Sequence, residues 1–304
     1  MFSTLIPFLP MRFWLLDLLS HFQTYYFVIA TVIFMILVFG LPFFKKGHTY
    51  WHMLFPTLFS LILSGLSLLP YLPTTAVTST KSEKQLSVMQ ANVFKFNSDH
   101  NAFLTQVQQH NPDVIAVAEA TPKWRDALKS LKKDWPHQVD KAKPGSHGML
   151  IFSKRPLSQV DTQYLGNPDI PTIFFQLEWQ DQQIQFISLH PLPPVCWVCF
   201  LSRDKNFLDI AEIVKKQSAD TPTIVLGDMN TTMFSPSYKT FINRTDLLNA
   251  RLGQGLYPTW PVTLPFFLRL PIDHILHSKN LDLLHFSALP TNNSDHLTTL
   301  AVFH

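Results

Sequence analysis

The sequence is poor in charged residues. Only 15% of its 304 residues are Asp, Glu, Lys or Arg, against roughly 25% in an ordinary soluble domain. Glycine occurs nine times and cysteine twice, whereas 46% of the residues are apolar and phenylalanine alone occurs 26 times. This composition excludes a disordered chain, a collagen-like chain and a disulfide-dense secreted scaffold. The length suffices for one large domain or two small ones.

The deficit of charge lies near the N-terminus. No Asp, Glu, Lys or Arg occurs between Asp17 and Lys45, or between Lys46 and Lys81, which excludes a wholly soluble protein. Five of the 24 basic and two of the 21 acidic residues precede Leu86, which leaves 19 of each beyond it. That C-terminal part is formally neutral, whereas a domain that grips the backbone of duplex DNA usually carries an excess of basic residues.

Two uncharged stretches predict an N-terminal transmembrane helical hairpin over residues 24–44 and 51–72. The first would form a helix about 31 Å long, the thickness of the hydrocarbon core of a bilayer. Aromatic residues stand at the ends of these stretches: Tyr25, Tyr26, Trp51 and Tyr71. Aromatic side chains of this kind mark membrane interfaces. The alternative is a pair of helices buried in a soluble core.

We assign residues 1–73 to a membrane anchor. Residues 11–22 are apolar but interrupted by charge, which favours an interfacial amphipathic helix over a third span. Lys45 and Lys46 lie in the short loop of the hairpin and favour the cytoplasm, so we expect the C-terminal domain outside it.

Residues 74–85 are polar and without periodicity, and we interpret them as a linker. Beyond them, over 86–304, short apolar runs alternate with helical patterns. We expect strands over 86–93, 114–118, 148–153, 172–179, 183–190, 223–226, 272–277 and 297–303, and helices over 99–110, 122–132 and 203–216. Strand pairs mixed with strand–helix–strand units indicate an α/β (α+β) fold of mixed sheets covered by helices.

Polar residues stand at the ends of these strands in a fixed order: Asn92, Glu119, His190, Asp228 with Asn230, Asp273, and Asp295 with His296. Ligands of α/β folds collect at strand ends, where the sheet positions the side chains of loops. A single Asp or Asn after a strand is more often a turn former or a helix cap. Caps alone do not explain the whole ordered set.

That set, with Gly-Asp-Met-Asn at 227–230 and Ser-Asp-His at 294–296 as its sharpest marks, resembles the endonuclease/exonuclease/phosphatase superfamily of magnesium-dependent phosphoesterases. The resemblance covers 86–304 and implies a four-layer α/β sandwich of two mixed sheets with helices outside. The anchor, with His-Pro-Leu-Pro-Pro at 190–194 and Leu-Pro-Ile-Asp-His at 270–274, resembles a membrane-bound bacterial subgroup. We therefore expect an integral protein of the bacterial inner membrane.

Hydrolysis of a phosphodiester needs a cation, an oriented water and a donor to the leaving oxygen. Oxygen ligands without thiolates suit Mg²⁺ or Mn²⁺. The resemblance places Asn92, Glu119 and Asp295 at the metal. Some nucleases of the family carry a second acid two positions after the strand-end Asn, but Phe94 stands here, which favours a single metal.

The resemblance also implies the catalytic roles. Asp228 would orient or deprotonate the attacking water, and Asn230 would hold that water and the phosphate. His190 and His296 would donate to phosphoryl oxygens. Asp273 would fix the tautomer of His296 by accepting its other N–H.

Two further features leave alternatives open. Arg203 meets a substrate phosphate or is an exposed residue at the start of a helix. Cys196 and Cys199 lack the two further ligands of a zinc site, and they lie in a proline-rich loop rather than in a redox motif. They form a local disulfide if the domain is exported, and otherwise remain thiols.

The sequence thus predicts a membrane-tethered, metal-dependent phosphoesterase that acts on a phosphodiester or phosphomonoester. Its partners are the lipid bilayer and a phospholipid, a lipid-linked phosphate or a nucleic acid. The first alternative is an endonuclease or exonuclease acting on DNA or RNA. The second is a catalytically silent membrane receptor or scaffold, which the intact set of polar residues disfavours.

Overall fold

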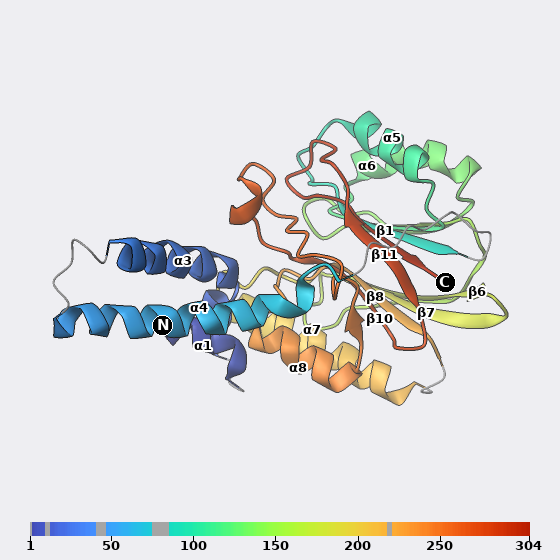
Figure 1. Cartoon of the computed structure of the whole chain (residues 1–304). Coiled ribbons are helices and arrows are strands. Elements are labelled where there is room, and N and C mark those ends of the chain that lie inside the picture. The colour runs from blue at the N-terminus through green and yellow to red at the C-terminus, as the bar shows by residue number, and fades with distance from the viewer. Residues whose placement is uncertain (1, 10–12, 41–46, 75–84, 218–220) are drawn as a thin grey trace.

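Two six-stranded mixed sheets pack face to face in a computed structural model that describes residues 2–9, 13–40, 47–74, 85–217 and 221–304. Helices α5 and α6 cover the outer face of one sheet, and α7 and α8 cover the outer face of the other (Figure 1). The predicted sandwich of two mixed sheets flanked by helices is confirmed.

The first sheet has the order β11-β12-β1-β2-β4-β3. Its strands are β1 (Leu86–Asn92), β2 (Val114–Ala118), β3 (His137–Lys141), β4 (Met149–Ser153), β11 (Leu283–Ala288) and β12 (Thr299–Phe303). Its helices are α5 (His100–His110) and α6 (Pro122–Ala127), which continues as a 3₁₀ turn over Leu128–Lys133. Because β1 and β2 run parallel, their carboxyl ends meet at one edge of the sheet.

The second sheet has the order β5-β6-β7-β8-β10-β9. Its strands are β5 (Leu157–Gln163), β6 (Thr172–Trp179), β7 (Gln182–Ser188), β8 (Thr223–Asp228), β9 (Leu248–Asn249) and β10 (Asp273–His277). Its helices are α7 (Trp197–Lys216) and α8 (Pro236–Thr245). Apolar side chains of both sheets fill the space between them, including the stacked rings of Phe175 and Phe186.

Strands β3, β5, β9 and β11 and helix α8 were not predicted, and α7 begins six residues before the expected start at Arg203. Strands β3, β5 and β11 lie at or beside sheet edges and carry many exposed or half-exposed residues. Helix α8 is polar except for the few side chains that it buries, and Ser235 caps it. None of these segments has the apolar periodicity from which the other elements were recognised.

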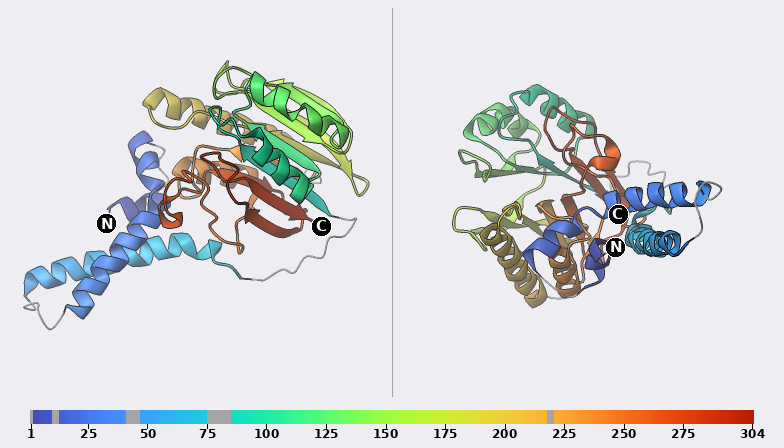
Figure 2. Two further views of the ribbon diagram at one scale, coloured as in Figure 1. Left: turned by 90° about the horizontal axis from the view of Figure 1, so that it is seen from above. Right: turned by 90° about the vertical axis from the view of Figure 1, so that its left-hand side faces the viewer.

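The N-terminal part forms α1 (Phe2–Leu5), α2 (Trp14–Ser20), α3 (Gln23–Phe39) and α4 (His48–Leu68). Helices α3 and α4 lie side by side and project away from the sandwich (Figures 1 and 2). Among the described residues, the segment His48–Tyr71 is long and apolar enough to cross a membrane, and α2 with α3 meets that test only as a pair bent by 61°. The chain therefore offers one candidate span and not an established hairpin.

Parts of the predicted anchor lie outside the described residues. These are residues 11 and 12 of the interfacial segment 11–22, residues 41–44 of the span 24–44, the loop residues Lys45 and Lys46, and residues 75–84 of the linker.

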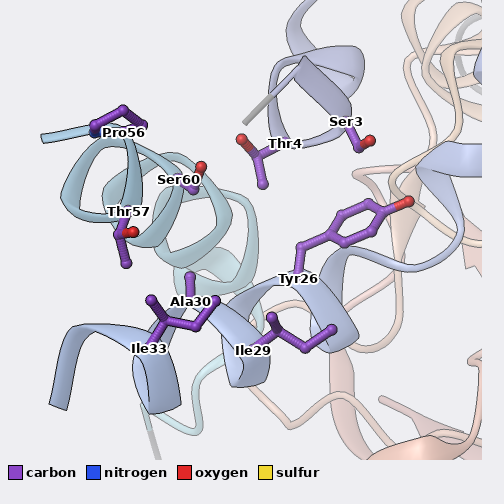
Figure 3. A pocket seen from close by; sticks show the side chains of 9 residues that line it. All are labelled: Ser3, Thr4, Tyr26, Ile29, Ala30, Ile33, Pro56, Thr57 and Ser60. Atoms are coloured by element: carbon purple, nitrogen blue, oxygen red, sulfur yellow. The ribbon is translucent and has the colours of Figure 1, made fainter. Parts of the chain in front are cut away.

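A small cavity of about 290 Å³ lies where α1, α3 and α4 meet. Figure 3 shows that hydroxyl groups and aliphatic side chains share its lining, with Ser3 and Thr4 from α1, Tyr26 from α3 and Ser60 from α4. Its lining contains no carboxylate or imidazole, so we assign no reaction to it.

Candidate active site

The pairing of the strands brings the predicted residues together at one end of the sandwich. Asn92 ends β1, and Glu119 follows the adjacent strand β2 with a left-handed backbone (φ 58°). In the other sheet, Asp228 of β8 and Asp273 of β10 are direct partners across an antiparallel ladder. Because β1 packs against both β8 and β10, residues of the two sheets meet.

Asp228 lies at the centre of this group and is almost fully buried. Its carboxylate accepts from Asn92 Nδ2 at 3.0 Å and from the backbone N–H of Asn230 at 2.9 Å. His190 Nε2 lies 3.4 Å from Oδ2. Burial alone would raise the pKa of Asp228, but His296 and His190 hold it below its usual value. Asp228 is therefore a stable anion that faces donors.

Asp273 and His296 form the predicted carboxylate–histidine pair, with Oδ2 and Nδ1 2.9 Å apart. Asp273 is fully buried, and its other oxygen accepts from Gln90 Nε2 at 3.1 Å. Burial opposes protonation of His296, but Asp273 and Asp228 together raise its pKa to about 10. The imidazole is consequently a cation at neutral pH, and its Nε2 is a proton donor 3.7 Å from Asp228.

Glu119 and Asp295 supply two further carboxylates to the same pocket. Glu119 Oε2 accepts from the backbone N–H of Lys95 at 3.0 Å, and Asp295 Oδ2 accepts from Trp260 Nε1 at 3.2 Å. Burial raises the pKa of Asp295, and the nearby charge of Glu119 adds to that effect. The buried Oδ1 of Asp295 has no hydrogen-bond donor among the described residues. Two repelling carboxylates, one with an unsatisfied oxygen, fit a divalent cation.

Asn92 differs in orientation from the other two expected metal ligands. Its Oδ1 accepts from the backbone N–H of Phe94 at 3.0 Å, and its Nδ2 faces Asp228 at 3.0 Å and Glu119 at 3.4 Å. In this orientation Asn92 holds the two carboxylates in place. Its amide oxygen faces the backbone N–H of Phe94 and is not directed at a cation that the carboxylates could bind.

A denser group of possible ligands is formed by Asp228, Asp273 and His296, with one ligand atom of each within 4.8 Å of the others. The hydrogen bonds described above already occupy the carboxylates of both Asp228 and Asp273. A protonated imidazole also has no lone pair to give to a metal. Glu119 and Asp295 therefore fit a cation better.

Asn230 and His190 complete the predicted group at the pocket. Asn230 Nδ2 donates to the carbonyl of Pro191 at 2.9 Å, which ties the loop after β8 to the loop after β7. Both side chains line the pocket together with the four carboxylate and imidazole residues Glu119, Asp228, Asp295 and His296.

Both expectations for Arg203 are wrong. Its side chain is fully buried, and Nη2 lies 2.5 Å from the carboxylate of Asp17 on α2. Its Nη1 donates to the backbone carbonyl of Asn230 at 3.0 Å. An arginine with these two partners is neither exposed nor available to a substrate phosphate. It supports the Asn230 loop from behind.

Helix α2 docks on the domain with its polar side. Asp17 is 0% exposed and also accepts from the Ser235 hydroxyl, and His21 Nδ1 lies 3.1 Å from the Thr232 hydroxyl. Leu15 and Leu19, on the opposite side of the helix, are 47% and 40% exposed. The usual arrangement of an amphipathic helix on a protein is thus inverted.

Cys196 and Cys199 are joined by a disulfide at the start of α7. Cys196 also caps the helix, because its sulfur accepts from the backbone N–H of Cys199 at 3.0 Å. Of the alternatives for this pair, the structure has the local disulfide.

The pocket has a volume of about 730 Å³. Several of its lining residues were not predicted, and most are apolar or aromatic: Leu18, His21, Phe22, Phe94, Phe96, His147, Val195, Trp260, Leu270 and Ile272. No local pattern marks them. Only the spacing of Asp17 and His21, four residues apart in an apolar helix, signals that one side of this helix contacts protein.

The sequence profile of the endonuclease/exonuclease/phosphatase family matches residues 89–296. The chain belongs to this family. It is therefore a hydrolase of phosphate ester bonds, with the strand-end residues of both sheets inside the matched region. No curated protein matches the chain significantly.

Solved structures of low sequence identity share the fold. The human Nocturnin catalytic domain with a bound sulfate is 22% identical with a TM-score of 0.61, and the match covers 73% of this chain and 93% of that one. Zebrafish (D. rerio) TDP2 with a single-strand DNA product is 15% identical with a TM-score of 0.59, and the match covers 73% of this chain and 100% of that one. Sphingomyelinase C from Streptomyces griseocarneus is 14% identical with a TM-score of 0.56, and the match covers 72% of this chain and 99% of that one.

Proposed function

We propose that this family member is a metal-dependent phosphoesterase tethered to a membrane by its N-terminal helices. The observation that carries the proposal is the buried anion Asp228, which lies between two imidazoles in a pocket that also holds Glu119 and Asp295. That combination supplies an acceptor for a water, donors for a phosphate and ligands for a cation.

Glu119 and Asp295 would hold the metal, which we infer to be Mg²⁺ or Mn²⁺ because the ligands are oxygens. When bound, the cation supplies positive charge that offsets the charge of the phosphate. Asn92 holds Glu119 and Asp228 in place by donating toward both. These residues fit one cation. The apolar Phe94 stands at the position where some nucleases of the family carry a second acidic residue, which agrees with a single metal.

The remaining residues act on the water and the leaving group. Asp228 accepts a hydrogen bond from the attacking water and directs its oxygen at phosphorus, while Asn230 holds the water and the phosphate. As the new P–O bond forms and the ester P–O bond breaks, cationic His296 gives its Nε2 proton to the leaving oxygen or to a phosphoryl oxygen. The Asp228 carboxylate accepts the proton that the attacking water loses and passes it to solvent, and Asp273 keeps His296 in a single tautomer.

The tether rests on the apolar surface of α3 and α4. Large side chains that include Ile29, Ile36, Phe39, Phe55 and Ile62 are exposed on these two helices, which is unfavourable in water and favourable in lipid. Lys45 and Lys46, between the two apolar segments, favour the cytoplasm. We therefore propose a bacterial inner-membrane protein whose C-terminal domain lies outside the cytoplasm.

The test is an assay of the full chain in lipid nanodiscs with bis-p-nitrophenyl phosphate, single-stranded DNA and phospholipid. We expect hydrolysis that Mg²⁺ or Mn²⁺ supports and EDTA abolishes. Full activity after removal of metal would contradict the proposed chemistry, and inactivity toward every ester would favour the silent scaffold. Cleavage of DNA alone would favour the nuclease.

A further inference from the structure

The pocket consists of two chemically different parts. Its floor is polar and contains the carboxylates and imidazoles described above. Its apolar lining comes from four separate regions of the chain: Leu18 and Phe22 at α2, Phe94 and Phe96 after β1, residues 191–195 after β7, and Trp260, Leu270 and Ile272 before β10. We call the part formed by Leu18 and Phe22 the α2 wall.

We propose that the substrate is an amphiphilic phosphate ester, with its phosphate on the polar floor and a hydrocarbon chain along the α2 wall. This inference rests on the phosphoesterase function proposed above and names the class of ester. Apolar walls contribute to binding in proportion to the apolar surface that the ligand buries, so they select a ligand that has such a surface.

The charges of the pocket support an ester with a single phosphate. Lys95 is the only Lys or Arg among the described lining residues, and its Nζ donates to the Ser146 hydroxyl at 2.9 Å. The guanidinium of Arg203 is paired with Asp17 behind the Asn230 loop and does not line the pocket. A polynucleotide presents a phosphate at every residue and is usually bound by several cations.

The rim of the pocket is apolar as well. Phe96 is 75% exposed and Val195 69% exposed, and Phe266 and Phe267 are also exposed on the nearby 3₁₀ turn Phe266–Leu268. A soluble protein rarely leaves such side chains together in water. They fit a surface that meets lipid.

This rim is continuous with the membrane helices. The hydroxyl of Tyr25 on α3 donates to the carbonyl of Leu268 in the 3₁₀ turn. On the other side of the pocket, Trp14 of α2 donates through Nε1 to the carbonyl of Pro194 at 2.8 Å. Helix α3, which we place in the membrane, and helix α2, which docks on the domain, therefore contact the loops that frame the pocket.

The test uses p-nitrophenyl alkyl phosphates with chains of one to eight carbons, assayed with Mg²⁺ and the full chain in nanodiscs. We expect kcat/KM to rise by about fourfold for each methylene that reaches the α2 wall. Leu18→Ser and Phe22→Ser should flatten this dependence, because they lower kcat/KM most for the esters with the longest chains. Val160→Ser is the matched control, because Val160 is an exposed apolar residue of β5 outside the pocket lining and should leave the dependence unchanged.

Binding of alkyl phosphates of the same chain lengths, measured by calorimetry, separates the two proposals. An affinity that rises with chain length in the wild type, and rises less in Leu18→Ser, supports the α2 wall. If that result is obtained but no ester is cleaved, the proposed hydrolysis is wrong and the α2 wall is still supported. An affinity and a kcat/KM that are both independent of chain length overturn the inference. Cleavage of single-stranded DNA at a rate that Leu18→Ser and Phe22→Ser leave unchanged, together with no effect of alkyl chain length, also overturns it.

Discussion

Asp273 influences the reaction through His296 and not through the substrate. It is fully buried and holds His296 Nδ1 at 2.9 Å. Asp273→Asn removes the charge that keeps the imidazole cationic and its orientation fixed, so we expect turnover to fall by about 10²–10⁴-fold. Because Asp273 is not among the proposed metal ligands, the Mg²⁺ concentration for half-maximal activity should stay nearly the same.

Glu119→Gln is the contrasting variant. It weakens the proposed metal site itself, so raising the Mg²⁺ concentration should recover part of its activity. A Mg²⁺ titration of turnover for both variants beside the wild type separates the two roles. Near-wild-type turnover of Asp273→Asn at saturating Mg²⁺ would mean that Asp273 only caps the turn before β10.

Gly227 allows the backbone of β8 to pass close to the loop after β7. It has φ +152°, and a Cβ atom there would lie 1.8 Å from the carbonyl oxygen of Leu189. We expect Gly227→Ala to reduce the free energy of unfolding by at least about 3 kcal/mol, because the clash is with backbone. Gly47→Ala is the control, since a Cβ at Gly47 meets nothing within 4 Å. Equal thermal unfolding midpoints of the two variants would refute this account.

The strand-end residues were predictable because polar side chains stand out after apolar strands. Two supporting residues were not predictable: Gln90, which donates to Asp273, and Trp260, which donates to Asp295. Each is distant in sequence from its partner, and nothing in its local pattern shows which carboxylate it will meet. The resemblance to the family supplied the roles of the predicted residues but not these supporting contacts.

Helix α2 supplies the counter-charge for a buried arginine of the domain. Burial alone would raise the pKa of Asp17, but Arg203 and His21 hold it well below its usual range. In Asp17→Asn the one described carboxylate left beside the guanidinium is that of Asp204, at 3.5 Å, so we expect a loss of about 3 kcal/mol in the free energy of unfolding. Turnover should fall too, since Arg203 holds the carbonyl of Asn230. Thermal unfolding of the full chain measures the first effect and ester hydrolysis the second.

Two controls define this prediction. Asp126→Asn breaks an exposed ion pair with Lys129 and should leave the thermal unfolding temperature nearly unchanged. Replacing both members of the buried pair, as in Asp17→Leu with Arg203→Met, should recover much of the stability lost in Asp17→Asn. If Asp17→Asn unfolds at the wild-type temperature, the contact does not contribute to stability.

The elements that sequence reasoning found are those that bury an apolar face, such as β2 and β6. Strand β5 was missed because most of its residues are exposed, so it lacks the alternation of a half-buried strand. Residues 11–22 were interpreted as an interfacial helix because charged residues interrupt their apolar run. The sequence did not reveal that Asp17 and His21 face the protein while Leu15 and Leu19 face outward, because that depends on where Arg203 and Thr232 lie in the folded domain.

We propose that the two lysines between the apolar segments of the N-terminal part set the orientation of the whole molecule. Because Lys45 and Lys46 favour the cytoplasm, we expect alkaline phosphatase fused after Gln85 to be active in a bacterial host. A fluorescent protein fused at the same point should be dark, since it folds poorly after export. The reverse result would place the domain in the cytoplasm, where the disulfide between Cys196 and Cys199 would be reduced.

The contact between Asp17 and Arg203 also sets an order of events during synthesis. The two residues are 186 positions apart, so α2 leaves the ribosome long before its binding surface exists. At about 5–20 residues per second, the delay is roughly 10–40 s. Throughout it, Asp17 is an unpaired carboxylate on a helix that otherwise favours lipid. Helix α2 is thus made early but is among the last to reach its native position, and a nascent chain carries no complete pocket until Asp295 and His296 have emerged.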